Sequence, residues 1–179
     1  HQRQFLGDLG LLRRAAIELP EVGKPLMPRP WREINTMTVA FGHGVAVSPL
    51  QLANAVAALL NGGLMRNPTL LAREGTVPGR RVVSQRTSDV MRWLMRLNVE
   101  QGTGKKARAP GYLVGGKTGT AEKVGTGGYR QRALLSSFVG AFPMKQPRYV
   151  VLAVLDEPQG RPETFGYATG GWTAAPVVG

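Results

Sequence analysis

The segment at residues 115–121 has the sequence GGKTGTA. It lies within residues 112–124, whose pattern predicts a strand. A lysine followed by two threonines forms a compact edge for an anion, because the ammonium supplies a point charge and the hydroxyls can donate to a carboxylate. Gly119 has no side chain, so a ligand or another backbone can approach closely. The segment therefore predicts a carboxylate-binding edge, with the amide of Thr120 directed at a developing oxyanion.

A structural interpretation of this tripeptide stands beside the functional one. Lys-Thr-Gly is short, and it also occurs on strands that bind nothing. On the tripeptide alone the structural interpretation is favoured, since short motifs are weak by themselves. The functional interpretation therefore depends on the rest of the chain.

Apolar runs on the C-terminal side of this segment predict the rest of an antiparallel sheet. Residues 125–128 are glycine-rich and predict a hairpin tip, from which Leu135 to Phe142 returns as a second strand. The near-continuous apolar run from Arg148 to Leu155 predicts a third strand that is covered on both faces. A last helix is expected to begin at Thr173.

Three helices are predicted on the N-terminal side. Residues 48–51 read Ser-Pro-Leu-Gln, a capping box that begins a buried helix from Pro49 to Leu60. Apolar spacing predicts a second helix from Gln85 to about Glu100, and an earlier one from Phe5 to Leu19 that Pro20 ends. These elements together predict the α/β class, with an antiparallel sheet backed by helices.

The composition excludes several classes of protein. The 179 residues have a formal net charge of +12, are 42% hydrophobic and include no cysteine, so neither disulfides nor thiolate metal sites are expected. The basic residues are scattered and form no basic helix or aromatic-interleaved strand, so nucleic acid is not expected as a partner. No cofactor is expected. No apolar run is long enough to span a membrane, and the start at His1 suggests that any anchor lies upstream.

Several conspicuous side chains have ordinary interpretations. Lys105 and Lys106 flank a glycine loop and are expected to be solvated. His43, between two glycines, is interpreted as a turn residue, and the carboxylate pair at residues 156–157 as a solvated strand end. Trp172, like the other two tryptophans, is expected in the core or at an interface.

Ordered blocks along the whole chain resemble the transpeptidase domain of class B penicillin-binding proteins, and most closely the division-specific (septal) peptidoglycan transpeptidase. The blocks are Phe41–Ala53, Gly102–Gly104, Gly115–Ala121, Ser136–Pro143, Arg148–Asp156 and Thr173–Pro176. Several blocks in the right order are far more specific than one tripeptide.

The resemblance implies a fold, an activity and roles for the residues. The implied fold is the C-terminal half of the penicillin-recognising serine transpeptidase and β-lactamase-like fold. The implied activity is D,D-transpeptidation of peptidoglycan stem peptides, with β-lactams as inhibitors, at the periplasmic face of the bacterial inner membrane. Lys117 would support proton transfer at the nucleophile. The hydroxyls of Thr118 and Thr120 would hold the substrate carboxylate beside Gly119, and the Thr120 amide would complete the oxyanion hole.

Two signatures of that family are missing from the chain. Members carry a nucleophile in Ser-x-x-Lys and a second element, Ser-x-Asn. None of the five serines here is followed by a lysine three positions on or by an asparagine two positions on. Residues 1–179 are therefore expected to be the C-terminal part of a single transpeptidase domain, whose N-terminal segment supplies both motifs. The chain alone should be inactive.

Two other functions remain open at this point. The chain could be a non-catalytic binding or scaffold module that keeps the carboxylate-binding edge, or a basic domain that binds an anionic polymer. Division-complex membrane proteins are further possible partners of the parent protein. An in-frame Ser-x-x-Lys upstream of His1 would favour the enzyme over the binding module.

Overall fold

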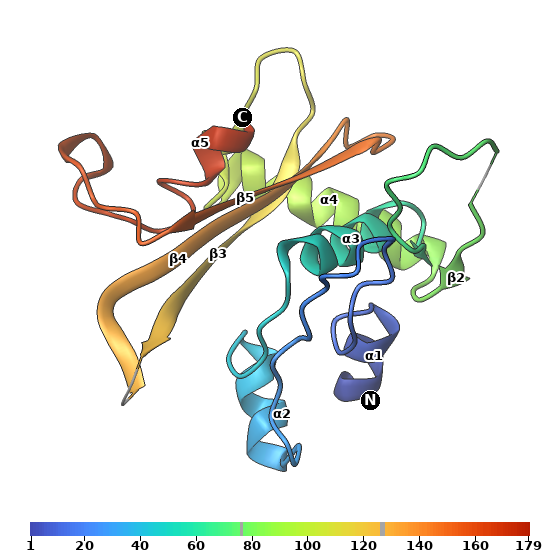
Figure 1. The fold of residues 1–179 in the computed structure, drawn as a ribbon. Helices are drawn as coiled ribbons and strands as arrows, with labels where there is room; N and C mark the ends of the chain where they lie inside the picture. Colours follow the sequence, from blue (N-terminus) through green and yellow to red (C-terminus); the bar gives the residue numbers. More distant parts are fainter. Residues whose placement is uncertain (76, 126–127) are drawn as a thin grey trace. The chain divides into compact units, whose positions relative to one another are not determined.

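The computed structural model describes residues 1–75, 77–125 and 128–179. The chain divides into two compact units, His1–Ser88 and Asp89–Gly179, and each is considered by itself. Figure 1 labels most of the elements of both units. None of the helices within the described residues is both long and apolar enough to cross a membrane.

The first unit is built mainly from helices. Its elements are α1 (Gln2–Asp8), α2 (Glu33–Ala40), α3 (Pro49–Leu60) and the two-residue strands β1 (Leu64–Met65) and β2 (Arg80–Arg81), which pair antiparallel. The helix α4 (Gln85–Gln101) begins at the end of this unit and continues into the second. The predicted helices at Pro49–Leu60 and Gln85–Glu100 are confirmed, the second with Ser84 Oγ accepting from the Thr87 amide at 3.0 Å.

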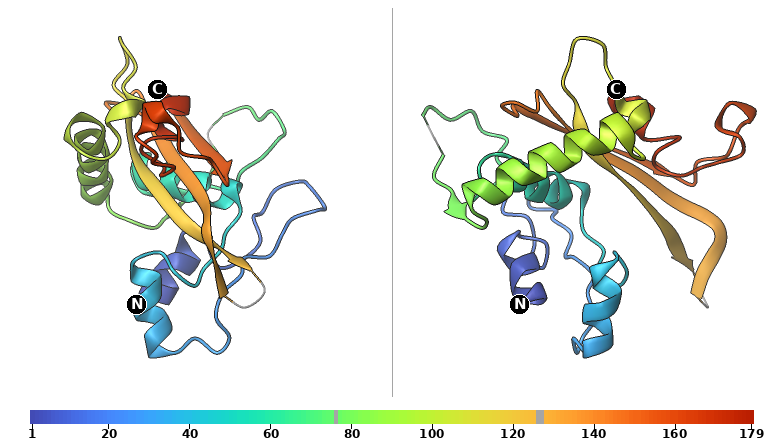
Figure 2. Two further views of the ribbon diagram at one scale, coloured as in Figure 1. Left: turned by 90° about the vertical axis from the view of Figure 1, so that its left-hand side faces the viewer. Right: turned by 180° about the vertical axis from the view of Figure 1, so that it is seen from behind.

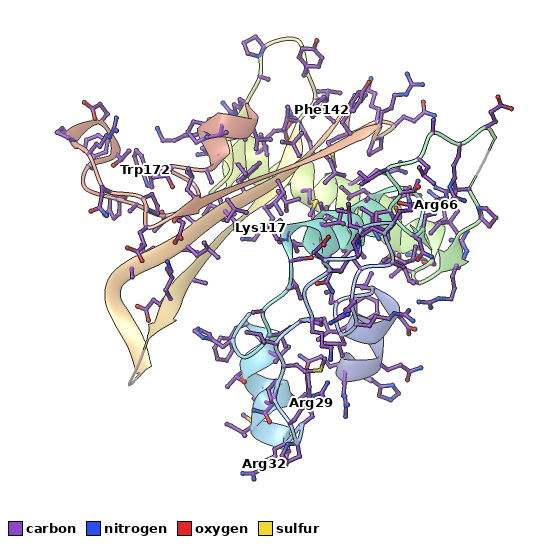
Figure 3. All side chains as sticks on the ribbon, viewed as in Figure 1. Arg29, Arg32, Arg66, Lys117, Phe142 and Trp172 are labelled. Carbon is purple, nitrogen blue, oxygen red and sulfur yellow. The ribbon has the colours of Figure 1, made fainter. Side chains whose placement is uncertain are left out.

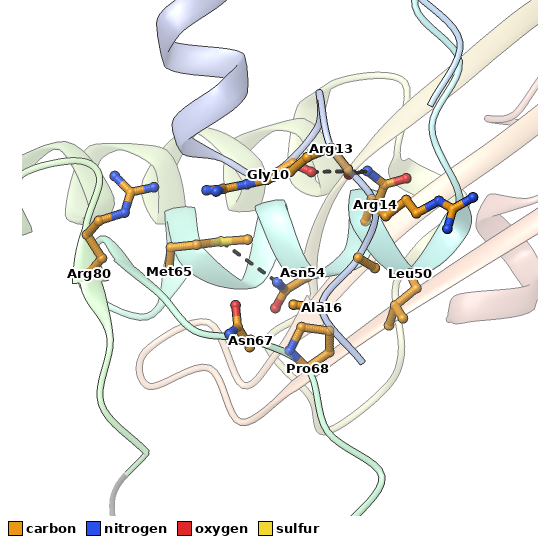
Figure 4. Close-up of a pocket in the computed structure, with 12 residues that line it drawn as sticks. Gly10, Arg13, Arg14, Ala16, Leu50, Asn54, Met65, Asn67, Pro68 and Arg80 are labelled. Carbon is orange, nitrogen blue, oxygen red and sulfur yellow. Dashed lines mark hydrogen bonds between the residues drawn. The ribbon is translucent and has the colours of Figure 1, made fainter. Parts of the chain in front are cut away.

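The capping box of α3 also anchors a distant loop. Ser48 Oγ accepts from the Gln51 amide at 3.3 Å, and Gln51 Oε1 accepts from the Ser48 amide at 3.1 Å. Gln51 is only 4% exposed, and its Nε2 donates to the carbonyls of Gly10 and Arg13 at 3.0 and 2.7 Å. Figure 4 shows the pocket of ≈ 230 Å³ beside this anchor, which Arg13, Arg14 and Asn54 also line. One buried amide thus satisfies both the helix cap and the loop, as buried polar groups require.

The predicted helix from Phe5 to Leu19 is wrong in its extent. The helix ends at Asp8, and Gly10 follows with a φ of +74°. This left-handed φ favours glycine at the turn, and an added Cβ would also displace the Met65 methyl group 2.9 Å away. The backbone carbonyls of Gly10 and Arg13 accept hydrogen bonds from Gln51 Nε2 and not from the amides of a continuing helix. Tertiary hydrogen bonds therefore override the apolar spacing that predicted the longer helix.

The second unit carries the antiparallel sheet. Its strands are β3 (Gly115–Gly125), β4 (Gly128–Phe142) and β5 (Tyr149–Asp156), in the order β3-β4-β5, with the single-turn helices η1 (Lys105–Ala107) and η2 (Pro162–Thr164) and the terminal α5 (Ala175–Val178). The predicted three-stranded antiparallel sheet is confirmed. The second strand begins earlier than predicted, and the last helix begins at Ala175 rather than Thr173. Of the predicted hairpin tip, residues 126–127 lie outside the described residues.

One apolar cluster joins the helices to the sheet. It contains Val99 of α4, Phe138 of β4 and the alanines at 107, 174 and 175, all fully buried. Figure 2 shows α4 running along one face of the sheet. A Cβ on Gly116 would lie 2.5 Å from Phe138 Cζ, and one on Gly104 would lie 3.1 Å from Phe138 Cε2. These two glycines therefore make room for the aromatic ring at the centre of the core.

The prediction that β5 is covered on both faces is wrong for this chain. Tyr149, Val151 and Val154 are exposed, whereas Ala153 and Leu155 pack against the apolar cluster. Among the described residues β5 pairs only with β4, and exposed apolar side chains lie on both of its faces. An apolar run indicates that a strand is suited to burial, but it does not show whether neighbouring elements are present to cover it.

The strand ends of β3 and β5 are joined by charge. Lys123 Nζ lies 2.8 Å from Asp156 Oδ1 and 2.9 Å from Glu157 Oε1. The hydrogen bonds to Asp156 and then to Glu157 raise the pKa of Lys123 above its ordinary value. The two carboxylates at the end of β5 thus form ion pairs with Lys123. The sequence had predicted only a solvated strand end.

Candidate active site

The predicted residues lie in sequence on β3, an outer strand of the sheet. Lys117, Thr118, Gly119 and Thr120 are opposite Val139, Phe138, Ser137 and Ser136 of β4, respectively. Because side chains alternate along a strand, Thr118 and Thr120 share one face of the sheet and Lys117 the other. Figure 3 shows Lys117 on β3 and Trp172 in the segment before α5.

Two glycines at or beside β3 leave room for close contacts. A Cβ on Gly119 would lie 2.5 Å from Ser137 Oγ on the neighbouring strand. A Cβ on Gly170 would overlap the Ser137 carbonyl and lie 2.5 Å from the Gly119 carbonyl. The segment around Gly170 is therefore packed directly against the backbone of β3 and β4, beside the Gly119 carbonyl.

A pocket of ≈ 500 Å³ collects the two threonines. It is lined by Gly102, Thr103, Lys105, Lys106, Thr118, Thr120, Thr169, Gly171 and Trp172. Lys117 does not line this pocket. Its Nζ donates to the carbonyl of the next residue, Thr118, at 2.9 Å and to Thr118 Oγ1 at 3.3 Å. The structure thus brings all the predicted polar groups to one edge of the sheet, with both hydroxyls at the pocket wall.

The two hydroxyls have different partners. Thr120 Oγ1 accepts from the Gly170 amide at 3.1 Å, so its own proton is directed elsewhere. Thr118 Oγ1 lies 2.9 Å from Thr103 Oγ1, which in turn donates to Asn98 Oδ1 at 3.2 Å. Asn98 Nδ2 donates to the Gly116 carbonyl at 2.8 Å. Asn98 and Thr103 were not predicted as site residues, and the only signal for them is the pair of glycines on either side of Thr103.

The charge of the pocket is positive. Among the described residues that line it, Lys105 and Lys106 are the only ionisable ones, and none is a carboxylate. Lys106 Nζ lies 4.3 Å from the centroid of the Trp172 ring, which stacks on Tyr167 at 5.7 Å and meets Phe165 edge-on at 5.5 Å. Lys106 is therefore held by a cation–π contact and is not simply solvated as expected. Two cations and two hydroxyls together suit an anionic ligand.

None of the five serines is arranged as a nucleophile. Ser48 and Ser84 cap helices, and the buried Ser88 accepts from the Gly62 amide at 3.0 Å. Ser136 is buried and donates to the Ala168 carbonyl. Ser137 faces Gly119 across the strand pair, and no lysine or histidine within hydrogen-bonding distance activates it among the described residues. The site can bind and polarise an acyl substrate, but it needs a nucleophile from elsewhere.

Comparison with known proteins identifies one family along the full chain. The family model described as the penicillin binding protein transpeptidase domain matches residues 1–179. The probable peptidoglycan D,D-transpeptidase FtsI of Caulobacter vibrioides is 47% identical, and the match covers 98% of this chain and 32% of that protein.

Solved structures agree with this match. The transpeptidase domain of Burkholderia pseudomallei penicillin-binding protein 3 is 35% identical with a TM-score of 0.85, over 98% of this chain and 53% of that one. Mycobacterium tuberculosis penicillin-binding protein 3, solved in complex with ampicillin, is 27% identical with a TM-score of 0.84, over 98% of this chain and 43% of that one. The chain thus spans about a third of the curated relative and about half of the solved domain. On its sequence and its fold alike, this chain belongs to the penicillin-binding protein transpeptidase family.

Proposed function

We propose that the chain is the C-terminal part of a single transpeptidase domain and supplies the carboxylate-binding side of a D,D-transpeptidase active site. The observation that carries the proposal is the pocket of ≈ 500 Å³, which two threonines and two lysines line and to which none of the described carboxylates contributes. The substrate is a peptidoglycan stem peptide that ends in D-Ala-D-Ala, whose terminal carboxylate matches this charge. β-Lactams occupy the same place.

Each residue of the segment has a distinct role in this proposal. Thr118 and Thr120 donate to the substrate carboxylate, and Gly119 lets the substrate backbone lie against β3. The Thr120 amide donates to the oxyanion that forms when a serine attacks the scissile carbonyl. Lys117 faces the nucleophile, and its positive charge favours the transfer of the serine proton.

The reaction itself is acyl transfer in two steps. The serine oxygen adds to the carbonyl of the penultimate D-alanine, and collapse of the tetrahedral species expels the terminal D-alanine with a proton. An amino group of a neighbouring stem peptide then attacks the acyl-enzyme and releases the serine. The serine, with its lysine base, comes from a segment outside residues 1–179, since none of the serines within this chain has the required spacing.

The cellular setting is part of the same proposal. A D,D-transpeptidase of this type works at the periplasmic face of the inner membrane, held by an anchor outside this chain. The relative from Caulobacter vibrioides is a probable FtsI, and residues 41–53 resemble the division-specific enzymes, so the septum is the proposed place of action. Membrane proteins of the division complex are the corresponding partners.

A second candidate function is a non-catalytic binding module. One observation favours it: every serine of the chain is engaged in a cap, buried in a hydrogen bond or packed against Gly119. Such a module would bind carboxylate-terminated peptides in the same pocket but would form no covalent intermediate.

Release of D-alanine separates the two candidates. The full-length protein would be incubated with a synthetic pentapeptide ending in D-Ala-D-Ala and an acceptor amine. It is expected to release D-alanine, and this release is expected to stop after treatment with a penicillin. Released D-alanine would be quantified with a D-amino acid oxidase. Binding of the peptide without any release, by a protein that is folded by circular dichroism, would support the binding module and contradict the enzyme.

A further inference from the structure

Asn98, near the C-terminal end of α4, connects two separate parts of the proposed carboxylate site. Its Nδ2 donates to the Gly116 carbonyl at 2.8 Å, directly before Lys117 on β3. Its Oδ1 accepts from the Thr103 hydroxyl at 3.2 Å, and Thr103 contacts Thr118 at 2.9 Å. A single carboxamide therefore reaches the site once through the backbone of β3 and once through a threonine hydroxyl.

The loop after α4 is shaped around this carboxamide. A Cβ on Gly102 would overlap Asn98 Oδ1, and a Cβ on Gly104 would lie 2.9 Å from Asn98 Nδ2. The amides of the same two glycines donate to the Asn98 carbonyl at 2.9 and 3.2 Å. Glycine on both sides of Thr103 thus allows the loop to close tightly over Asn98, which fixes where the Thr103 hydroxyl stands.

The chemistry of the amide oxygen sets the direction of the hydroxyl chain. A carboxamide oxygen only accepts, so the single hydroxyl proton of Thr103 is committed to Asn98. In the ligand-free site, Thr118 is then the donor in the contact between the two threonines, and its hydroxyl turns this proton to the carboxylate when the substrate binds. The lone pairs of Thr118 are left to accept from Lys117 Nζ, which lies 3.3 Å away. The order of the chain is Lys117 to Thr118 to Thr103 to Asn98, and Asn98 is its terminal acceptor.

We infer that Asn98 is a positioning residue for the transpeptidase reaction. It does not touch the substrate. It holds the backbone directly before Lys117 through Gly116 and fixes the rotamer of Thr118 through Thr103. This inference rests on the proposed function, because it names the group that orders the carboxylate site in that proposal. A site whose donors are fixed before the substrate arrives reacts faster than one that must order them.

Acylation kinetics of the full-length protein test the inference. Asn98→Ala is expected to lower the second-order rate constant for acylation by a penicillin about 10- to 100-fold, the effect of a small misplacement of reacting groups. Thr103→Val removes only the hydroxyl that links Asn98 to Thr118, and it is expected to lower the same rate constant by a smaller factor. If Asn98 acts through Thr103, the double variant will lose less than the product of the two single losses. Strict multiplication of the two losses would overturn the inference.

A matched control separates positioning from loss of stability. Asn54 also donates from Nδ2 to a backbone carbonyl, that of Arg66 at 2.9 Å, but it lies in the other unit. Asn54→Ala is expected to lower the thermal midpoint and to leave the acylation rate of the folded protein unchanged. An Asn98→Ala protein that acylates at the rate of Asn54→Ala would overturn the inference.

Two further measurements keep the outcome unambiguous. Should Asn98→Ala not fold, Asn98→Asp takes its place: an aspartate still accepts the Thr103 proton, so Thr103→Val is expected to slow this variant as much as it slows the unsubstituted protein. A Thr103→Val change without effect in the Asn98→Asp background would count against the inference. The unsubstituted protein is measured first, because failure of that protein to acylate contradicts the proposed function itself, whereas acylation that is indifferent to Asn98 contradicts only the inference.

Discussion

Replacement of Lys117 by alanine in the full-length protein is expected to slow acylation by a penicillin about 10²–10³-fold, the loss that follows removal of one preorganised electrostatic contact to a transition state. The Lys117 ammonium lies 2.9 Å from the Thr118 carbonyl and 3.3 Å from Thr118 Oγ1, at the edge of β3 where the proposed nucleophile approaches. Its removal takes away both a positive charge and the donor that orients Thr118. The second-order rate constant would be measured with a fluorescent penicillin.

Lys145→Ala is the control for this change. Lys145 is exposed and lies in the connection between β4 and β5, outside the pocket that holds Thr118 and Thr120. Its removal lowers the net charge of the protein by the same amount, so any long-range effect of charge on the anionic penicillin is matched. Equal losses for the two variants would mean that the site is not at Lys117.

Gly170→Ala is expected to damage both stability and acylation. A Cβ at this position overlaps the Ser137 carbonyl and lies 2.5 Å from the Gly119 carbonyl, and neither backbone atom can turn away as a side chain would. Overpacking of this kind costs about 1–3 kcal/mol of the free energy of unfolding. The displaced segment also loses the hydrogen bond from the Gly170 amide to Thr120 Oγ1. Urea unfolding and the acylation rate would both be measured.

Gly23→Ala provides the comparison. An added Cβ at Gly23 has no atom within 4 Å, and its φ is outside the left-handed region. The same chemical change should therefore leave both the unfolding midpoint and the acylation rate within experimental scatter of the unsubstituted protein. A Gly170→Ala protein with an unchanged midpoint would show that the segment before α5 is not packed against β3 as described.

Features set by neighbouring residues were predictable from the sequence. The cap at Ser48 and Gln51 depends on residues three positions apart, and the helix that it begins was predicted with its observed bounds. The segment at 117–120 was placed on a strand because its own pattern is extended, and the strand it pairs with is close in the chain. The resemblance of ordered blocks then assigned the family, which the match of the family model along the whole chain confirms.

Features set by distant contacts were not predictable in this way. The hydrogen bond from Asn98 to Gly116 spans 18 residues, and the one from Gly170 to Thr120 spans 50. The first helix was predicted too long because Gln51, about 40 residues away, takes the carbonyls of Gly10 and Arg13. The periodicity of apolar residues predicts the buried face of a single helix or strand. It gives no information about which polar side chain of another element will form a hydrogen bond with it.

The serine that carries the penicillin adduct identifies the nucleophile of the proposed reaction. The full-length protein would be labelled with a penicillin, digested and mapped by mass spectrometry. The proposed function predicts one adduct per molecule, on a serine that lies outside residues 1–179 and is followed three positions later by a lysine. An adduct on any of the five serines within residues 1–179, or a folded protein that forms no adduct, would contradict it.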